Sequence, residues 1–394
     1  MTATPLAPLT TLRLGGPARR LLSATTDEEL IELVRAADAA GEPLLLLAGG
    51  SNVVVADDGF DGTVVRVETR GVIPDGPLLR VAAGEPWDPF VARCVEEGLA
   101  GIECLSGIPG SVGATPIQNV GAYGQDVSET VMSVRVLDRR TGAVEELPRA
   151  ACGFSYRSSV FKRDPSHHVV LAVTYALDRD ALSRPIRYAE LARALGVELG
   201  DRAPLADVRE AVLALRRRKG MVLDPDDPDS VSAGSFFTNP ILAAEDFARL
   251  EERAGDGVPR WPEPDGRVKT SAAWLIERAG FTKGHGDPAT IAISSKHTLA
   301  LTNRGAGTTA QLVALAREIA SGVRERFGVE LHPEPVFVGH EWEGAEEARA
   351  AGEAAPYEGA ADEPVPHAGG AAAAPHAPGR PAPPPRSSPH SSRT

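Results

Sequence analysis

The stretch LLLLAGGSNVVVAD, residues 44–57, predicts two buried strands joined by a tight loop. Glycine, serine and asparagine between the two apolar runs are typical turn residues. The backbone amides of such a loop can converge on an anion, which makes Gly49, Gly50, Ser51 and Asn52 a candidate cradle for a phosphate group. A plain hairpin turn would use the same residues. Neither the G-x-G-x-x-G nor the G-x-x-x-x-G-K-[ST] pattern is present.

The segments around this stretch indicate a mixed α and β protein. Residues 26–40 predict a helix, with Thr26 and Glu29 in the pattern of a capping box. The last predicted strand, 329–338, carries prolines and is therefore expected at a sheet edge. The remaining predicted elements are strands at 63–67, 78–82, 131–137 and 168–177, and helices at 205–217 and 309–327.

Length and charge exclude several classes of protein. The chain has 394 residues, enough for two to three domains. Its net charge of −13 argues against nucleic acid or an anionic membrane as the main partner. No apolar run is long enough to cross a membrane, and the N-terminus lacks a signal-peptide pattern. We therefore expect a cytoplasmic protein, and we also expect a monomer.

Cysteine and histidine usage gives no sign of a disulfide scaffold or a metal site. The three cysteines are an odd number without C-x-x-C spacing, and the nine histidines lack the spacing of metal ligands. We expect no metal. Residues 341–394 are rich in alanine and proline and predict a disordered tail, with a docking segment as the alternative.

Four further stretches contain candidate functional residues. Residues 107–124 are dense in glycine with apolar residues interleaved, which favours a shaped loop close to a flat or charged group over a flexible surface loop. In FSYRSSVFK (154–162), Tyr156 and Arg157 alternate with apolar positions as on a strand facing a cleft, although such a pair is usually solvated.

Ser235 and Glu334 lie in the other two stretches. Ser235 in SAGSFFTNP (232–240) has no G-x-S-x-G context, which argues against a hydrolase and leaves a cap serine as the alternative. Glu334 lies between Pro333 and Pro335, so its backbone is stiff and its carboxylate is pre-positioned. An exposed edge-strand glutamate would show the same pattern.

Taken together and in this order, these stretches resemble the bacterial UDP-N-acetylenolpyruvoylglucosamine reductases. The resemblance covers about residues 10–340 and rests on several strings: AGGSNVVVAD, GIPGSVGATPIQNVGAYGQ, YRSSVFK, AGSFFTNP, KTSAAWLIERAGFTKG and LHPEPVFVG. It implies an α+β fold, with a vanillyl-alcohol-oxidase (PCMH)-type FAD-binding domain in two lobes and a smaller α/β substrate-binding domain. The expected boundaries are 1–205 for the FAD-binding domain, with a returning strand at 328–340, then 206–327 for the substrate-binding domain and 341–394 for the tail.

The resemblance also implies the cofactors. FAD is expected to be bound non-covalently, because neither LLLLAGGSN nor GAYG contains a histidine or cysteine, and NADPH is the expected hydride donor. The residues implied in FAD binding are Gly49, Gly50, Ser51, Asn52, Ser111, Val112, Gly113, Gly121, Ala122, Tyr123 and Gly124.

The reaction implied is reduction of a UDP-sugar enolpyruvyl ether, in peptidoglycan precursor synthesis. By the resemblance, Ser235 donates a proton to carbon, while Arg157 and Glu334 bind the substrate carboxylate and stabilise its enolic form. The alternative is another FAD-dependent oxidoreductase of the same flavin-binding class, acting on a different alcohol or sugar.

The resemblance further assigns the substrate diphosphate to Tyr188, Lys219 and Asn239, with Tyr188 on a segment found in the subtype that closes a loop over its substrate. Two positions depart from the common pattern. Thr238 replaces a lysine and Val336 replaces an arginine, which could change the charge of the site.

Overall fold

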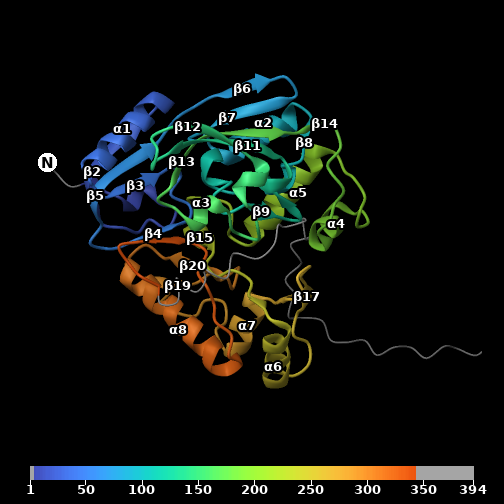
Figure 1. Cartoon of the computed structure of the whole chain (residues 1–394). Coiled ribbons are helices and arrows are strands. Elements are labelled where there is room, and N and C mark those ends of the chain that lie inside the picture. The colour runs from blue at the N-terminus through green and yellow to red at the C-terminus, as the bar shows by residue number, and fades with distance from the viewer. Residues whose placement is uncertain (1–3, 343–394) are drawn as a thin grey trace, which may run out of the picture.

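The computed structural model describes residues 4–342. Apart from its first two residues, the predicted tail at 341–394 lies outside the described part of the chain. The described residues form a larger body, drawn at the top of Figure 1, and a smaller body below it. None of the helices within 4–342 is long and apolar enough to span a membrane.

The first sheet of the larger body is mostly parallel, in the order β1-β2-β5-β3, and helix α1 (Asp27–Ala39) packs against it. Thr26 caps α1 as predicted by accepting the N–H of Glu29, but the Glu29 carboxylate accepts hydrogen bonds from Thr25. The helix buries Leu30 and Val34 against this sheet. The strands are β1 (Thr4–Pro5), β2 (Pro17–Ala24), β5 (Phe60–Val67) and β3 (Leu44–Leu47).

The loop after β3 leads out of this sheet. The next strand, β4 (Val53–Val55), pairs in parallel with β21 (Val336–Val338), near the C-terminal end of the described chain. Strands β3 and β4 are therefore not a hairpin, and the hairpin alternative for residues 48–52 is wrong. The strand predicted at 329–338 is also mostly wrong, because only its last three residues form a strand. Pro333 and Pro335, on either side of Glu334, have no backbone N–H to donate to a neighbouring strand, so the strand begins only after them.

The second sheet of the larger body is antiparallel, in the order β12-β11-β13-β7-β6. Trp87 and Phe90 of helix α2 (Trp87–Glu96) pack against Tyr175, with ring centroids 5.5–6.1 Å apart. The strands are β12 (Val144–Pro148), β11 (Val131–Asp138), β13 (His168–Ala176), β7 (Leu78–Ala82) and β6 (Val72–Asp75). Short paired strands lie beside it: β8 (Leu99–Ala100) with β14 (Asp178–Arg179), and β9 (Gly121–Ala122) with β10 (Gln125–Asp126).

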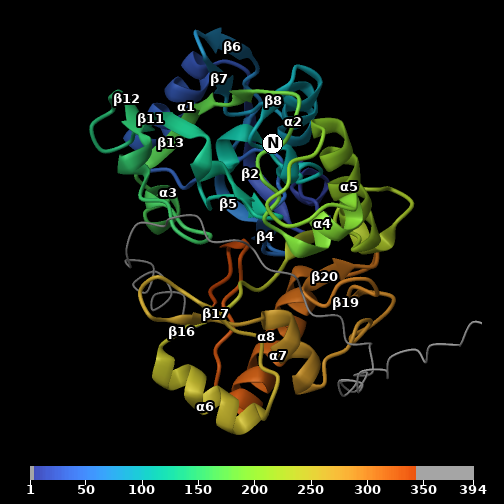
Figure 2. The ribbon, with the colours of Figure 1, turned by 90° about the vertical axis from the view of Figure 1, so that its right-hand side faces the viewer.

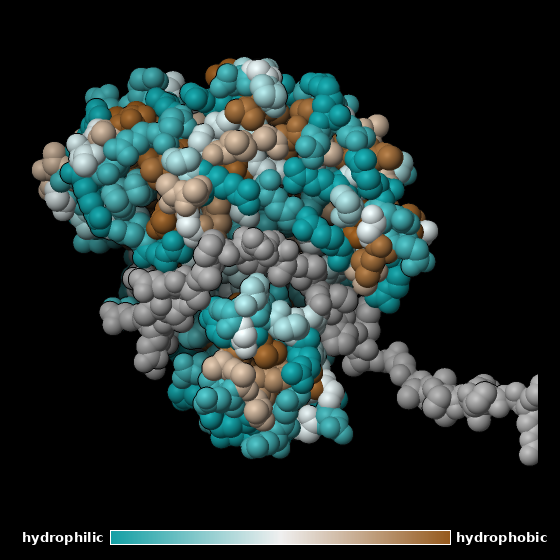
Figure 3. Space-filling model, turned by 45° about the vertical axis from the view of Figure 1, so that its right-hand side comes forward, coloured by the Kyte–Doolittle hydropathy of each residue, from teal (hydrophilic) through white to brown (hydrophobic). Residues whose placement is uncertain are grey.

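The smaller body consists of two three-stranded sheets and three helices, seen at the bottom of Figures 1 and 2. Helix α8 (Thr309–Phe327) has the predicted bounds and begins with a complete capping box at Thr308. In the view of Figure 3, hydrophobic residues are scattered over a mostly hydrophilic surface. The other elements are β15 (Ser232–Ser235), β20 (Ala300–Asn303), β19 (Ile291–Ile293), β16 (Ile241–Leu242), β18 (Val268–Lys269), β17 (Trp261–Pro262), α6 (Ala244–Ala254) and α7 (Ala272–Ala279).

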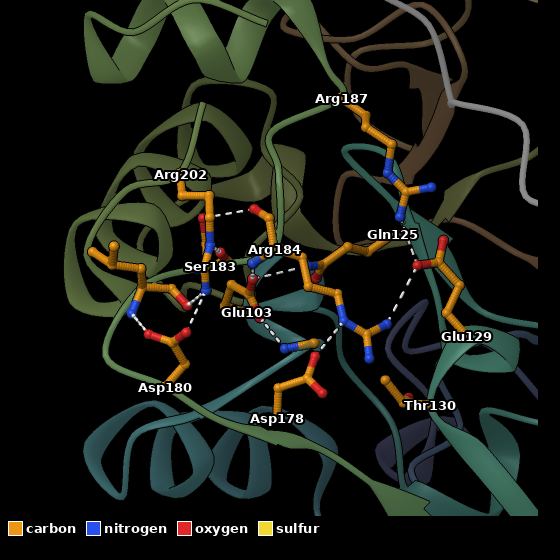
Figure 4. Close-up of polar contacts among 12 residues, drawn as sticks. Glu103, Gln125, Glu129, Thr130, Asp178, Asp180, Ser183, Arg184, Arg187 and Arg202 are labelled. Carbon is orange, nitrogen blue, oxygen red and sulfur yellow. Dashed lines mark hydrogen bonds and ion pairs between the residues drawn. The ribbon is translucent and has the colours of Figure 1, made fainter. Parts of the chain in front are cut away.

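A buried carboxylate fastens the segment that carries α4 (Ala189–Leu195) and α5 (Leu205–Arg218) to the larger body. Glu103 is 0% exposed. It accepts hydrogen bonds from the Gly101 N–H at 2.6 Å, from Gln125 Nε2 at 2.9 Å and from the Arg184 N–H at 3.1 Å (Figure 4). The third of these bonds ties the segment to its place four residues before Tyr188.

Replacing Glu103 by alanine is expected to lower the free energy of unfolding by about 3 kcal/mol, because three buried donors lose their acceptor. Urea unfolding followed by tryptophan fluorescence measures this. Glu97→Ala removes an exposed carboxylate paired with Arg93 and should change the same quantity by less than about 0.5 kcal/mol. Equal urea midpoints for Glu103→Ala and the wild type would contradict the anchoring role.

Candidate active site

One cleft between the two bodies gathers most of the predicted site residues. Its empty space, open mouth included, is about 1330 Å³. The cleft is lined by all three predicted catalytic residues, all three predicted diphosphate-binding residues and four of the predicted flavin-binding residues. They are Arg157, Ser235 and Glu334, then Tyr188, Lys219 and Asn239, and finally Ser51, Gly121, Ala122 and Tyr123.

Arg157 lies in a tight turn, not on the predicted strand. Backbone hydrogen bonds in both directions join Ser155 and Ser158, and Arg157 has a φ of 52°, in the left-handed region. Such a conformation costs a non-glycine residue of order 1–3 kcal/mol. The strand prediction for 154–162 is wrong because Ser159 caps a short helix, α3 (Val160–Arg163), immediately after the turn.

The Arg157 guanidinium is fixed by several partners. Nη2 donates to the Gly121 carbonyl at 2.6 Å, and Nε lies 3.5 Å from Glu334 Oε1. Nη1 lies 4.0 Å from a carboxylate oxygen of Asp126. Only 15% of each side chain in the Arg157–Glu334 pair is exposed, so the pair is little screened by solvent.

Glu334 is connected to the glycine loop through Gln118. Gln118 Nε2 donates to Glu334 Oε1 at 3.2 Å, while Asn52 Nδ2 donates to Gln118 Oε1 at 2.7 Å. The Glu334 N–H donates to the Phe236 carbonyl at 2.8 Å, one residue after Ser235. Asn52, which the resemblance assigns to the cofactor, therefore contacts the predicted catalytic machinery through one side chain.

Ser235 is the last residue of β15, with its hydroxyl near the hairpin between β19 and β20. Its Oγ lies 3.5 Å from Nε2 of His297. Burial, with smaller contributions from Lys219, Lys283 and Arg216, lowers the pKa of His297 to about 3. The imidazole is therefore neutral near neutral pH.

The three predicted diphosphate residues also line the cleft. Lys219 Nζ forms an ion pair with Glu190 of α4 at 2.7 Å and lies 5.9 Å from the centre of the Tyr123 ring. The Tyr188 ring meets Tyr123 edge to face at 5.2 Å. Asn239 accepts the N–H of Ala272 through its Oδ1.

Comparison with known proteins agrees with this geometry. The C-terminal domain of UDP-N-acetylenolpyruvoylglucosamine reductase matches residues 226–338, and an FAD binding domain matches residues 18–148. The reductase of Streptomyces coelicolor is 62% identical over 343 residues, covering 85% of this chain and 89% of its own length. The reductase of Thermobifida fusca is 60% identical over 347 residues, covering 85% and 97%.

The chain belongs to the UDP-N-acetylenolpyruvoylglucosamine reductase family. The solved reductase (MurB) of Thermus caldophilus has the same fold, with a TM-score of 0.59 and 25% identity, covering 86% of this chain and 98% of its own. The predicted α+β, FAD-binding fold class and the predicted family are confirmed.

The two glycine-rich loops fit the pyrophosphate of FAD, the cofactor of this family. The backbone N–H groups of Gly50, Ser51 and Asn52 donate no hydrogen bond to any residue within 4–342. The Ser111 hydroxyl is buried and likewise has no partner in this range. Successive free amides and a free hydroxyl, with no carboxylate among them, are the donor set that an anion requires.

Close packing leaves no room for side chains in these loops. A Cβ on Gly49 would lie 2.7 Å from the Cα of Gly110, and one on Gly113 would lie 2.5 Å from the Cβ of Ala83. Gly50 has a φ of 58°, and a Cβ there would lie 2.0 Å from the Leu9 carbonyl oxygen. Gly49, Gly50, Asn52, Ser111, Val112, Gly113 and Gly124 do not line the cleft itself.

The two departures from the family pattern differ in position. Thr238 lines the cleft, and its hydroxyl donates to the His332 carbonyl at 3.3 Å. Val336 lies on β21, is 46% exposed and does not line the cleft. Of the two positions, only Thr238 therefore lies where a change of charge would affect the cleft lining.

Sequence reasoning missed several residues of the site. Gln118 and Lys162 lie inside the motifs GIPGSVGATPIQNVGAYGQ and YRSSVFK, so the resemblance could have indicated them. Glu190 is two residues after Tyr188, on the same helical segment. His297 lies outside every quoted motif, and only the pairing of β15 with β20 brings it to Ser235.

Three ligand-type side chains also meet outside the cleft. Asp138, His167 and His168 have ligand atoms within 4.8 Å of one another. Asp138 accepts the backbone N–H groups of Thr141 and Arg140 and bonds His167, and these contacts lower the pKa of its carboxyl to about 2. These hydrogen bonds show that the cluster stabilises the turn at residues 138–141. The absence of a metal remains a prediction.

Gly50→Ala is expected to weaken FAD binding at least about tenfold, because the new Cβ displaces the loop from the Leu9 backbone. The ratio of flavin absorbance to protein absorbance after purification measures this. Gly76→Ala is the matched control: its φ is 60°, and a Cβ there meets nothing within 4 Å. Normal flavin content in Gly50→Ala would contradict the cradle.

Proposed function

We propose that the chain reduces the enolpyruvyl ether of UDP-N-acetylglucosamine to UDP-N-acetylmuramate, with bound FAD and with NADPH as hydride donor, in peptidoglycan precursor synthesis. We assign Ser235 as proton donor, Arg157 and Glu334 to the substrate carboxylate, and Tyr188, Lys219 and Asn239 to the diphosphate. The observation that carries these roles is the single cleft that brings the six side chains together beside the glycine loop.

FAD, when bound, supplies hydride that it has received from NADPH. The chain's own residues must then protonate the carbon next to the substrate carboxylate. The Ser235 hydroxyl is the donor, and His297 at 3.5 Å orients it. Serine is a weak acid, so the charge left on Oγ needs stabilisation. The cations Lys219 and Arg216, which help to lower the pKa of His297, also favour a negative charge on the neighbouring serine oxygen.

Arg157 and Glu334 act on the carboxylate end of the substrate. The guanidinium can bind a carboxylate and stabilise the charge that develops on it as the enolic form appears. Its hydrogen bond to Gly121 and its ion pair with Glu334 hold it in one orientation before substrate arrives. This preorganisation lowers the reorganisation needed at the moment of reaction.

The diphosphate residues are positioned for an exchange of partners. Lys219 is neutralised by Glu190, so a diphosphate must replace that carboxylate to bind the ammonium group. Asn239 lines the cleft, and its Oδ1 already accepts the N–H of Ala272, so Nδ2 is its donor group for a ligand. The Tyr188 ring, which also lines the cleft, packs on Tyr123.

A different substrate for the same flavin domain is not favoured, because the match to the reductase family extends over the C-terminal domain. We also propose that the protein acts as a monomer in the cytoplasm. One chain supplies every proposed catalytic and diphosphate-binding residue of the cleft. All three cysteines are free and buried, as suits a reducing compartment.

Ser235→Ala is expected to keep the flavin spectrum and its bleaching by NADPH, and to slow recovery of the spectrum with the enolpyruvyl nucleotide by roughly 10²–10⁴-fold. Anaerobic stopped-flow spectroscopy separates the two steps. Ser166→Ala, at an exposed serine outside the cleft lining, is the control and should keep both rates. Normal recovery in Ser235→Ala would remove the serine from its proposed role.

A further inference from the structure

Lys162 contacts Arg157 and lies with it in the motif YRSSVFK, and it has no assigned role so far. It is the third residue of the short helix α3, whose N-cap Ser159 is fully buried. Its Nζ donates to the Arg157 carbonyl oxygen at 3.2 Å. Lys162 does not line the cleft, so it can act on a ligand only through Arg157 and its neighbours.

The contact falls on the strained residue of the turn. Arg157 holds its left-handed backbone only because the surroundings fix it, and the Lys162 ammonium group binds the carbonyl of that residue. To stabilise the turn, the Arg157 carbonyl needs only a hydrogen-bond donor, and a neutral donor would serve as well as the charged Lys162. The positive charge therefore requires a second explanation.

The charges around Arg157 supply that explanation. Two carboxylates flank the guanidinium, Glu334 at 3.5 Å and Asp126 at 4.0 Å. With Arg157 alone, this group would carry a net charge of −1 and would repel an incoming carboxylate. The ammonium group of Lys162 restores the neutrality of this group. Burial lowers the pKa of Lys162, and the negative charge of Glu334 opposes that effect by favouring the charged form.

We infer that Lys162 is a positioning residue for the carboxylate-binding site of Arg157: it fixes the turn that presents the guanidinium and balances the two flanking carboxylates. The inference rests on the proposed function, since it takes the carboxylate of the enolpyruvyl or lactyl group as the ligand of Arg157. Lys162 thereby contributes to the preference for nucleotide sugars that carry a carboxylate.

The test compares binding of two nucleotides that differ in this group. UDP-N-acetylmuramate carries a lactyl carboxylate, and UDP-N-acetylglucosamine lacks the lactyl group. Each is titrated into FAD-loaded protein, with the change in flavin absorbance as the signal. Lys162→Met should weaken binding of UDP-N-acetylmuramate about tenfold, as expected for one lost charge at short range, and should leave UDP-N-acetylglucosamine within about twofold. Lys162→Arg should recover most of the loss.

Arg163 provides the matched control. It is the next residue of α3, and its Nη1 donates to the Gly153 carbonyl at 3.1 Å and reaches the Ser158 hydroxyl at 3.4 Å, so it braces the same turn without contacting Arg157. Arg163→Met should keep the difference between the two nucleotides. Equal selective losses in Arg163→Met and Lys162→Met would reduce Lys162 to a structural support and overturn the inference.

The remaining outcomes also decide. If Lys162→Met binds both nucleotides as the wild type does, or loses both equally, the inference is wrong while the proposed function stands. If the wild type itself does not prefer UDP-N-acetylmuramate, the carboxylate site of the proposed function fails. If Lys162→Met loses its flavin, Lys162→Gln, which keeps a donor for the Arg157 carbonyl but not the charge, must show the selective loss.

Discussion

The ion pair between Arg157 and Glu334 is the contact on which the arrangement of the cleft depends. Arg157 belongs to the larger body, and Glu334 lies on the segment that returns from the smaller body to pair with β4. Gln118 and Asn52 connect the same glutamate to the glycine loop. The Glu334 N–H is bonded next to Ser235. The relative positions of the glycine loop, Ser235 and Arg157, which we propose as flavin loop, proton donor and carboxylate site, therefore follow from a few bonds around one carboxylate.

Buried charge is costly unless it is paired. Within the described chain, two cations of the cleft satisfy this rule with protein partners: Lys219 pairs with Glu190, and Arg157 pairs with Glu334 and Asp126. An anionic substrate therefore meets two cations that already have carboxylate partners. Affinity comes from the difference between two sets of contacts, so the flanking carboxylates influence binding as much as the cations do.

Elements whose signals are local could be predicted from the sequence. Helices α1 and α8 begin at cap residues and keep a helical apolar period, and their predicted bounds hold within a residue. The turn at Arg157 could not be predicted, because its strained backbone depends on Lys162 and on Gly121 across the loop. The site followed the same division. Motifs indicated Ser235 and Glu334. In contrast, His297 reaches Ser235 only through strand pairing, and Glu190 reaches Lys219 only through the packing of α4.

With its net charge of −13, the molecule as a whole repels its anionic substrate. Recognition must then come from charges inside the cleft, where screening by salt is weak. Thr238, where the resemblance leads one to expect a lysine, has a neutral hydroxyl that donates to the His332 carbonyl. Lys219 and Arg216, both in the lining, also lie close enough to lower the pKa of His297. Cations proposed to attract the diphosphate therefore also act on the surroundings of the proposed proton donor Ser235.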